Sequence, residues 1–183
     1  PTGAIEGLFY ISNTKQVYFS QGNLLHEDNT WSFTEHQYDK GSYFGWGTSG
    51  YGDPDTISVG KGIHFASIGG TSRNANFDWG VYNAISNGGN TPGLWRTLTR
   101  DEWTYLLEHH TCEWTTISEQ PGLKVMADDN EHFLFLPAAG QIGIEATDIS
   151  DANSGHYWAS TSSGDYDKSA EAYKMTATNP EFE

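Results

Sequence analysis

Cysteine is nearly absent from this sequence. Cys112 is the only one in the 183-residue chain, so an internal disulfide is excluded. A chain of this length does not need one, because a domain of that size buries roughly two-thirds of the surface that its unfolded chain exposes. The length predicts a single domain over residues 1–183, stabilised by its core rather than by cross-links.

Positive charge is also scarce. Nine Lys and Arg residues stand against 24 Asp and Glu residues, which gives a formal net charge of -15 at pH 7. The basic residues form no run and no basic helix, so nothing can displace the counterions of a phosphate backbone. We therefore expect no nucleic acid partner. The diffuse acidity is typical of an exposed surface that keeps a protein soluble.

Long hydrophobic runs are missing too. No stretch approaches the roughly 20 apolar residues of a transmembrane helix, so direct membrane insertion is not expected. What the chain does have is 7 Trp, 10 Tyr, 9 Phe and 21 Gly residues. Aromatic residues with many Gly turns favour short strands and long ordered loops over a helix bundle.

Strand patterns dominate the first third of the chain. Residues 7–12, 15–24 and 30–35 predict a three-stranded meander. Residues 36–94 show no persistent period, but their large aromatic residues indicate long ordered loops rather than disorder. These aromatic residues include Phe44, Trp46, Tyr51, Phe77, Trp79 and Tyr82.

One helix is clearly signalled, over residues 100–109. Thr99 is its predicted N-cap, and Glu102 stands three residues later, as a reciprocal capping box requires. The expected buried stripe has the i, i+3, i+4 spacing of a helix face and consists of Trp103, Leu106 and Leu107.

Strands return after this helix. Residues 123–128 and 131–140 predict a hairpin that turns at Asp129-Asn130, and residues 141–155 predict a loop. The segments "HYWAST" and "AEAYKMTAT" predict two more strands near the end of the sequence. The whole pattern indicates a β-rich α+β fold with one or two helices.

Four pieces of sequence together resemble a known family. They are "KQVYFSQGNL", "FGWGTSGY", "FDWGVYNAISNGGN" with "LWRTLTRDEWTYLL", and "LPAAG…GHYWASTS…AYKM", in this order. They resemble exported paralogous domains of gut-type bacteria, which are related to sulfatase-modifying factors and to the formylglycine-generating-enzyme branch of the C-type lectin-like fold. "WRTLTRDEW" is similar to the "WRLPTEAEW" helix start of that branch. The resemblance covers nearly the whole chain and implies a C-type lectin-like fold.

The sequence departs from this family at two points. The formylglycine-generating enzyme uses a pair of cysteines that bind copper, whereas Cys112 stands alone, so the resemblance does not carry that activity over. Family domains usually end in a strand similar to "G-F/Y-S-V-R". This chain ends in "TATNPEFE", which implies that the final family strand is missing or different.

The same branch includes the variable proteins of diversity-generating retroelements. "YWASTS" followed by "AYKM" resembles the penultimate core strand, the ligand-facing turn and the next strand of that branch. Those proteins place their hypervariable positions in this stretch. The resemblance therefore implies a scaffold that holds a tunable binding face over residues 156–176.

Cys112 could be a nucleophile, with His109 or His110 as its base. A thiolate nucleophile also needs a group that orients the base and an oxyanion site, which sequence neighbours seldom supply. The two histidines could instead bind a metal together with His132 or residues 128–129. Adjacent helical residues point about 100° apart, however, rather than along one face. Both patterns favour a structural role.

The loop "DISDANSG" clusters oxygen ligands that could hold calcium: Asp148, Asp151 and Asn153. It lacks the Gly and the terminal Glu of an EF-hand loop, and a turn capped by Asx side chains is the more ordinary interpretation. We therefore assign no cofactor.

Several tryptophans could stack on sugars, namely Trp46, Trp79, Trp95 and Trp158, but their context favours scaffold positions. Strand alternation places Trp158 inward and Tyr157 outward, and in "AEAYKM" it places Tyr173 and Met175 inward and Lys174 outward. The intervening stretch combines Tyr with Ser, Gly and Asp, which is the chemistry of adaptable binding loops. The candidate ligand contacts are Tyr157, Ser163, Asp165, Tyr166, Asp167, Lys168 and Lys174.

The sequence thus favours a non-catalytic ligand-binding domain of the receptor or adhesin type. Trp79, Trp95, Trp103 and Trp158 would hold its core, and its partner would be a protein or glycan on another surface. The family resemblance implies an extracellular location, on a bacterial cell or a phage. Two alternatives stay open. One is an enzyme, or enzyme remnant, of the sulfatase-modifying type, and the other is a structural module of a larger surface protein.

Overall fold

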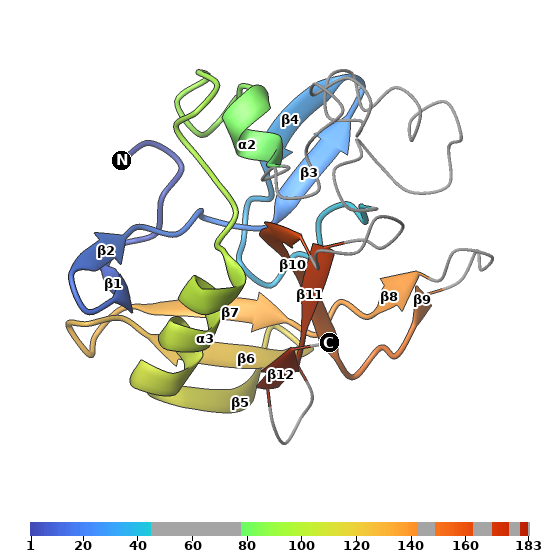
Figure 1. Cartoon of the computed structure of the whole chain (residues 1–183). Helices are drawn as coiled ribbons and strands as arrows, with labels where there is room; N and C mark the ends of the chain where they lie inside the picture. Colours follow the sequence, from blue (N-terminus) through green and yellow to red (C-terminus); the bar gives the residue numbers. More distant parts are fainter. Residues whose placement is uncertain (45–77, 143–148, 163–169, 176–179, 183) are drawn as a thin grey trace.

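The computed structural model describes residues 1–44, 78–142, 149–162, 170–175 and 180–182, the last two segments by their backbone alone. These residues form a β-rich α+β arrangement with two short helices and several small antiparallel sheets (Figure 1). The predicted fold class is confirmed at this level. The helices are α2 (Trp79–Tyr82) and α3 (Arg100–His109). The strands are β1 (Phe9–Ser12), β2 (Lys15–Val17), β3 (Leu24–Glu27), β4 (Thr30–Phe33), β5 (Cys112–Ile117), β6 (Gln120–Met126), β7 (Phe133–Pro137), β8 (Gln141–Ile142), β9 (Ile149–Ser150), β10 (Gly155–Ser162), β11 (Ala170–Met175) and β12 (Pro180–Phe182).

The N-terminal strands form two separate hairpins, so the predicted three-stranded meander is wrong. β1 pairs with β2, and β3 pairs with β4. The stretch expected as one strand over residues 15–24 is interrupted because its middle bonds to the N-terminal segment instead. The backbone N–H of Ile5 donates to the carbonyl of Phe19 at 3.0 Å, and that of Gln21 donates to the carbonyl of Gly3 at 2.7 Å.

Helix α3 begins and ends at the predicted residues. The Thr99 hydroxyl accepts a hydrogen bond from the Glu102 backbone N–H, and the Glu102 carboxylate accepts one from the Thr99 N–H at 3.0 Å. Trp103 and Leu106 are buried and Leu107 is partly buried. The capping box and the buried stripe are therefore both confirmed.

One of the two three-stranded sheets in the described chain has the order β5-β6-β7. The β6–β7 hairpin was predicted, and its turn residue Asn130 has a φ of 57°. β5 was not predicted. It joins β6 through a two-residue turn of Ser118 and Glu119, whose φ values of 48° and 67° are both left-handed. Such turns usually carry Asn-Gly or Asp-Gly, and Ser-Glu is not a recognisable turn signal.

Three more short strands lie in segments for which no strand was expected. β8 and β9 pair within the predicted loop, and β12 pairs with β11, so that the C-terminal sheet has the order β10-β11-β12. Within the predicted loop region 36–94, residues 45–77 lie outside the described part of the chain. The described remainder contains the short helix α2.

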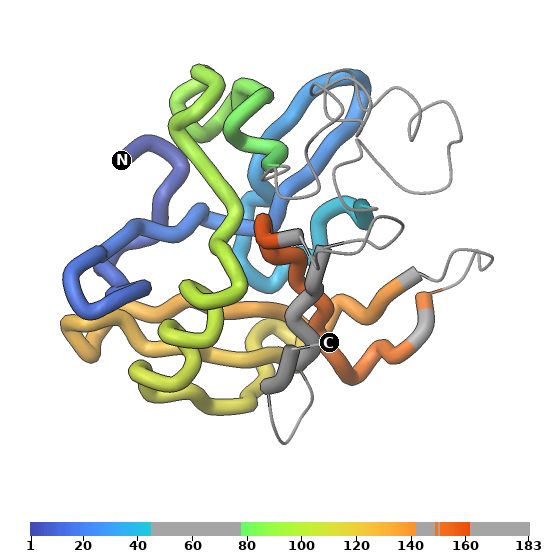
Figure 2. The backbone as a smooth tube through the Cα atoms, in the orientation of Figure 1, coloured from blue at the N-terminus to red at the C-terminus, as the bar shows by residue number. Residues whose placement is uncertain are grey.

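The core consists of two clusters, and β10 lies between them. The first cluster combines α3 with β1, β6, β7 and Ala159 of β10. The second consists of Trp31, Phe33, Trp79 and Ile85. In Figure 1, α3 lies in front of the β5–β7 sheet, while β3, β4 and α2 form the opposite end of the molecule. The tube in Figure 2 follows β10 through the middle of this arrangement.

Candidate functional site

The two C-terminal strands that should carry the binding face are present. β10 and β11 are antiparallel, with Tyr157 opposite Tyr173 and His156 opposite Lys174. The register shifts between Trp158 and Ser162. The predicted contacts Ser163, Asp165, Tyr166, Asp167 and Lys168 lie outside the described residues. The same holds for the side chains of Lys174, Tyr173 and Met175.

The prediction that Tyr157 faces outward is wrong. Its hydroxyl donates a hydrogen bond to the Pro137 carbonyl at 2.8 Å, and its ring packs against the first cluster, 6.2 Å from the ring of Trp103 between centroids. Burial raises the pKa of Tyr157 well above its ordinary value. Alternation along β10 mispredicts Tyr157 because side chains from both faces of the strand pack against a core cluster.

Trp158 is directed inward, as predicted, toward the second cluster. Its indole N–H donates to the Phe44 carbonyl at 2.8 Å, and its ring packs against that cluster. The indole of Trp103 in turn donates to the Trp158 carbonyl at 3.3 Å. Consecutive residues of β10 thus bind opposite halves of the molecule.

The far end of β10 is held as well. The Ser160 N–H donates to the Leu98 carbonyl at 2.9 Å, and the Arg100 N–H donates to the Thr161 hydroxyl at 3.0 Å. These bonds attach the strand to the segment that leads into α3. The backbone is therefore fixed up to the point where the connection to β11 begins.

Cys112 has the environment of a structural thiol. Its sulfur lies 3.5 Å from the His110 carbonyl and 3.7 Å from the Leu107 carbonyl, and burial raises its pKa. Nδ1 of His109 faces the Tyr105 carbonyl at 3.0 Å. Both ring nitrogens of His110 are engaged elsewhere, with the Leu106 carbonyl and the Asp128 carboxylate. The proposed thiol–base pair is not assembled in this geometry.

The His110 ring bridges helix α3 to residues after β6. Its Nδ1 lies 2.8 Å from the Leu106 carbonyl, and its Nε2 lies 2.8 Å from an Asp128 carboxylate oxygen. His132 forms a separate group, between Glu6 at 2.8 Å and Asp129 at 2.7 Å. Within the described residues, no three His, Cys, Asp or Glu side chains gather as a metal site.

The candidate calcium loop is only partly described, because Asp148 lies outside the described residues. The Asp151 carboxylate accepts a hydrogen bond from the Ser154 hydroxyl at 3.1 Å and lies 3.2 Å from Nε2 of His156. The Ser154 N–H also donates to the Asp151 carbonyl at 2.9 Å. Asn153 is exposed. Asp151 therefore begins a turn that its backbone carbonyl closes, while its carboxylate contacts the side chains of Ser154 and His156.

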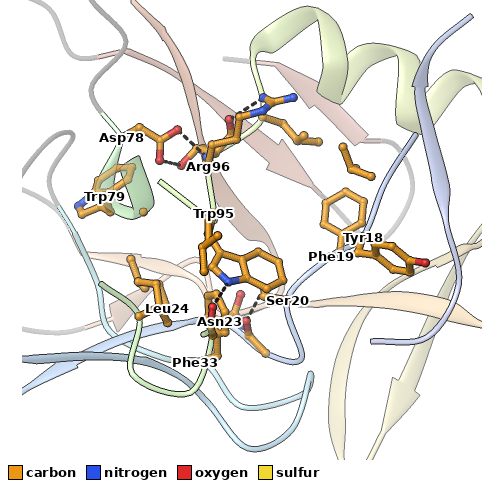
Figure 3. Close-up of a pocket in the computed structure, with 18 of the residues that line it drawn as sticks. Tyr18, Phe19, Ser20, Asn23, Leu24, Phe33, Asp78, Trp79, Trp95 and Arg96 are labelled. Carbon is orange, nitrogen blue, oxygen red and sulfur yellow. Dashed lines mark hydrogen bonds between the residues drawn. The ribbon is translucent and has the colours of Figure 1, made fainter. Parts of the chain in front are cut away.

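A cavity of about 790 Å³, which sequence reasoning did not find, lies where the two core clusters meet (Figure 3). Trp103, Leu98 and Tyr157 line it from the first cluster, and Phe33 and Trp79 line it from the second. The tryptophans were expected as scaffold, and no sequence pattern indicated that their packing would leave a space.

Trp95 lies in the middle of this cavity wall. Figure 3 shows its indole between Tyr18 and Phe19 on one side and Leu24 on the other. Its N–H donates to the Gly88 carbonyl at 2.8 Å, and its ring meets Phe33 edge-on with 4.9 Å between centroids. A larger residue in place of Gly88 would clash, because its Cβ would lie 2.6 Å from the indole nitrogen of Trp95.

The charged wall of the cavity is formed by Asp78 and Arg96. Asp78 is only 3% exposed and accepts hydrogen bonds from the Thr97 N–H at 2.6 Å and the Thr97 hydroxyl at 3.3 Å. Burial raises its pKa to about 6, although the bonds from Thr97 oppose the shift. Arg96 forms a two-pronged pair with Glu102 at 2.7 and 2.8 Å. Burial alone would raise the pKa of Glu102, but these bonds hold it below its ordinary value.

No helix among the described residues is long and apolar enough to cross a membrane. No protein-family model matches the chain, and neither a curated protein nor a solved structure is significantly similar to it.

Proposed function

We propose that the chain is a non-catalytic ligand-binding domain of the receptor or adhesin type, with a C-type lectin-like fold and a binding face at residues 156–176. The observation that supports it best is the anchoring of β10. Side-chain and backbone hydrogen bonds tie this strand to Pro137, Phe44 and Leu98, so the chain enters the connection to β11 from a fixed base. A site on a rigid support keeps its geometry better than one on an unsupported loop.

The composition of the segment between β10 and β11 favours ligand recognition over a turn that binds nothing. Tyr166 is flanked by Asp165, Asp167 and Lys168, and Ser163 lies at the β10 end. A tyrosine ring offers a large contact area at a low entropic cost, while short polar neighbours adapt their hydrogen bonds. With Lys174, these residues are the proposed ligand contacts. Tyr157 is not among them, because its hydroxyl donates a hydrogen bond to the Pro137 carbonyl.

The partner proposed for this face is a protein or a neutral glycan on another surface. A net charge of -15 disfavours the binding of anionic polymers, including nucleic acids, because like charges repel. The motif order further supports a place among the variable proteins of diversity-generating retroelements, outside the cytoplasm on a bacterial cell or a phage. The geometry of Cys112 favours this proposal over the enzyme alternative, because its sulfur faces backbone carbonyls.

The experiment is binding of the purified domain to arrays of glycans and bacterial surface proteins. A Tyr166→Ala/Lys168→Ala variant is compared with Tyr10→Ala, which removes an exposed tyrosine on β1, outside the proposed face. We expect binding by the unaltered domain and by Tyr10→Ala, and its loss in the double variant. Equal binding by all three proteins would place the ligand elsewhere. No binding by any of them would favour a structural module.

A further inference from the structure

We propose that the cavity between the two core clusters is a second ligand site, which takes a small, uncharged, largely apolar molecule with a flat ring. Its volume of about 790 Å³ falls within the roughly 300–1,000 Å³ of typical small-molecule pockets. Like such pockets, it is lined mainly by aromatic and aliphatic side chains, and a few polar groups lie at its edge.

The mouth of the cavity exposes apolar side chains to solvent. Tyr18 is 42% exposed, Val81 is 42% exposed and Leu94 is 58% exposed, and all three line the cavity. They come from three separate segments and share one cavity. Exposed apolar residues around a hollow often mark a surface that a partner covers. At this hollow, the partner would be small enough to enter between the clusters.

The charged groups of the wall argue for an uncharged occupant. Asp78 already accepts two hydrogen bonds from Thr97, and both prongs of Arg96 are taken by Glu102. An anion would meet the Asp78 carboxylate without a free cation to offset it. A cation would lose its hydration and would meet a carboxylate whose charge is already partly offset by two hydrogen bonds from Thr97. Either ion would pay the full desolvation cost of entering an apolar site.

Three more polar side chains of the wall form hydrogen bonds with backbone atoms. Ser20 donates to the Gly22 carbonyl at 2.8 Å, and the Asn23 amide donates to the Asp39 carbonyl at 2.8 Å. Gln37 donates to β7 at 3.2 Å and accepts from it at 2.6 Å. An occupant therefore needs few polar atoms of its own. The aromatic surfaces of Trp95 and Phe19 would instead favour a flat ring, through stacked or edge-on contacts.

The test uses N-phenyl-1-naphthylamine, a neutral apolar probe whose fluorescence rises and shifts to the blue when it leaves water. The purified domain is titrated beside Leu94→Lys, which places a charge at the mouth of the cavity. The matched control is Ile149→Lys, because Ile149 is also apolar and 44% exposed but does not line the cavity. Both substitutions are at exposed positions, and circular dichroism checks that both variants fold.

We expect saturable binding by the unaltered domain and by Ile149→Lys, and about tenfold weaker binding by Leu94→Lys, as the loss of one apolar contact predicts. The Tyr166→Ala/Lys168→Ala variant should bind the probe normally, so this site and the proposed face at 156–176 can fail independently. Absence of saturable binding by the unaltered domain overturns the proposal. So does an equal loss of binding in Leu94→Lys and Ile149→Lys.

Discussion

The Tyr157 hydroxyl donates a hydrogen bond to the Pro137 carbonyl, and this bond connects the C-terminal sheet to the end of β7. The Ala139 N–H donates to the same carbonyl at 2.8 Å. Removing the hydroxyl therefore weakens the connection without leaving the Pro137 oxygen unpartnered.

Tyr157→Phe should lower the free energy of unfolding by about 1 kcal/mol, the usual net value of one such hydrogen bond. Urea denaturation monitored by tryptophan fluorescence measures the change. Tyr10→Phe is the control. The Tyr10 ring is exposed on β1, so this variant should be as stable as the unaltered protein. Equal stability of Tyr157→Phe and the unaltered protein would show that the bond is not maintained in solution.

Thr99→Ala should destabilise the protein by about 1 kcal/mol, because it removes the side-chain half of the capping box of α3. Thr104→Ala makes the same chemical change within the helix. There the Thr104 hydroxyl donates only to the Arg100 carbonyl, at 3.0 Å, one turn earlier in the same helix. Alanine is also a better helix former than threonine. We expect Thr104→Ala to be neutral or slightly stabilising when the thermal unfolding of both variants is measured. If both variants lose equal stability, the cap is not the cause.

His132 should link stability to pH. Its hydrogen bond to Asp129, helped by Glu6, raises the pKa of His132 above the ordinary value of 6.5, and the same contact lowers the pKa of Asp129 to about 2. The histidine contribution is complete below 6.5 and is lost as the pH rises through the raised pKa. The aspartate contribution is complete above its ordinary value of 3.8 and is lost as the pH falls toward 2.

The contact should therefore stabilise the fold most between about pH 4 and 6.5. The difference in unfolding free energy between the unaltered protein and His132→Gln, measured from pH 4 to pH 9, should shrink at the alkaline end. An NMR titration should show the pKa of His132 falling toward its ordinary value in Asp129→Asn. A pKa that does not move in this variant would contradict the assignment.

Cys112 should react slowly with a thiol reagent in the native protein at pH 8. Burial raises its pKa, which lowers the fraction of thiolate, the reactive form. Labelling by 5,5′-dithiobis(2-nitrobenzoate) should become fast once urea unfolds the chain. Fast labelling of the native protein, especially with copper bound after purification, would instead favour the enzyme of the sulfatase-modifying type.

Elements with local signals were predictable from the sequence. The boundaries of α3 follow from Thr99, Glu102 and the spacing of its apolar residues, all within a few turns of chain. β5 was missed because its turn at Ser118 and Glu119 lacks the residues that usually adopt left-handed backbone. Local pattern fixes an element only where the residues that determine it are neighbours in sequence.

The orientation of Tyr157 and the cavity depend on distant segments. Alternation assumes that a strand has one covered face, whereas β10 contacts a cluster on each side. The cavity is lined by Trp95, Phe33 and Trp103, which come from separate segments, so no single segment encodes the space that they leave. For the face at 156–176, the sequence predicted the two strands correctly. Its ligand contacts remain predictions.

The position of β10 between the clusters also constrains the order in which the chain can fold during synthesis. The Phe44 carbonyl receives its hydrogen bond from Trp158, which is synthesised 114 residues later. The Pro137 carbonyl likewise receives a hydrogen bond from the later residue Tyr157. A nascent chain that has not yet emerged beyond β9 leaves the β10-facing side of each cluster uncovered, and exposed apolar surface of this kind invites aggregation. Contacts of such long sequence separation form slowly. The helix and the β5–β7 sheet can therefore assemble early on the ribosome, while closure of both cores is a late event that depends on one strand.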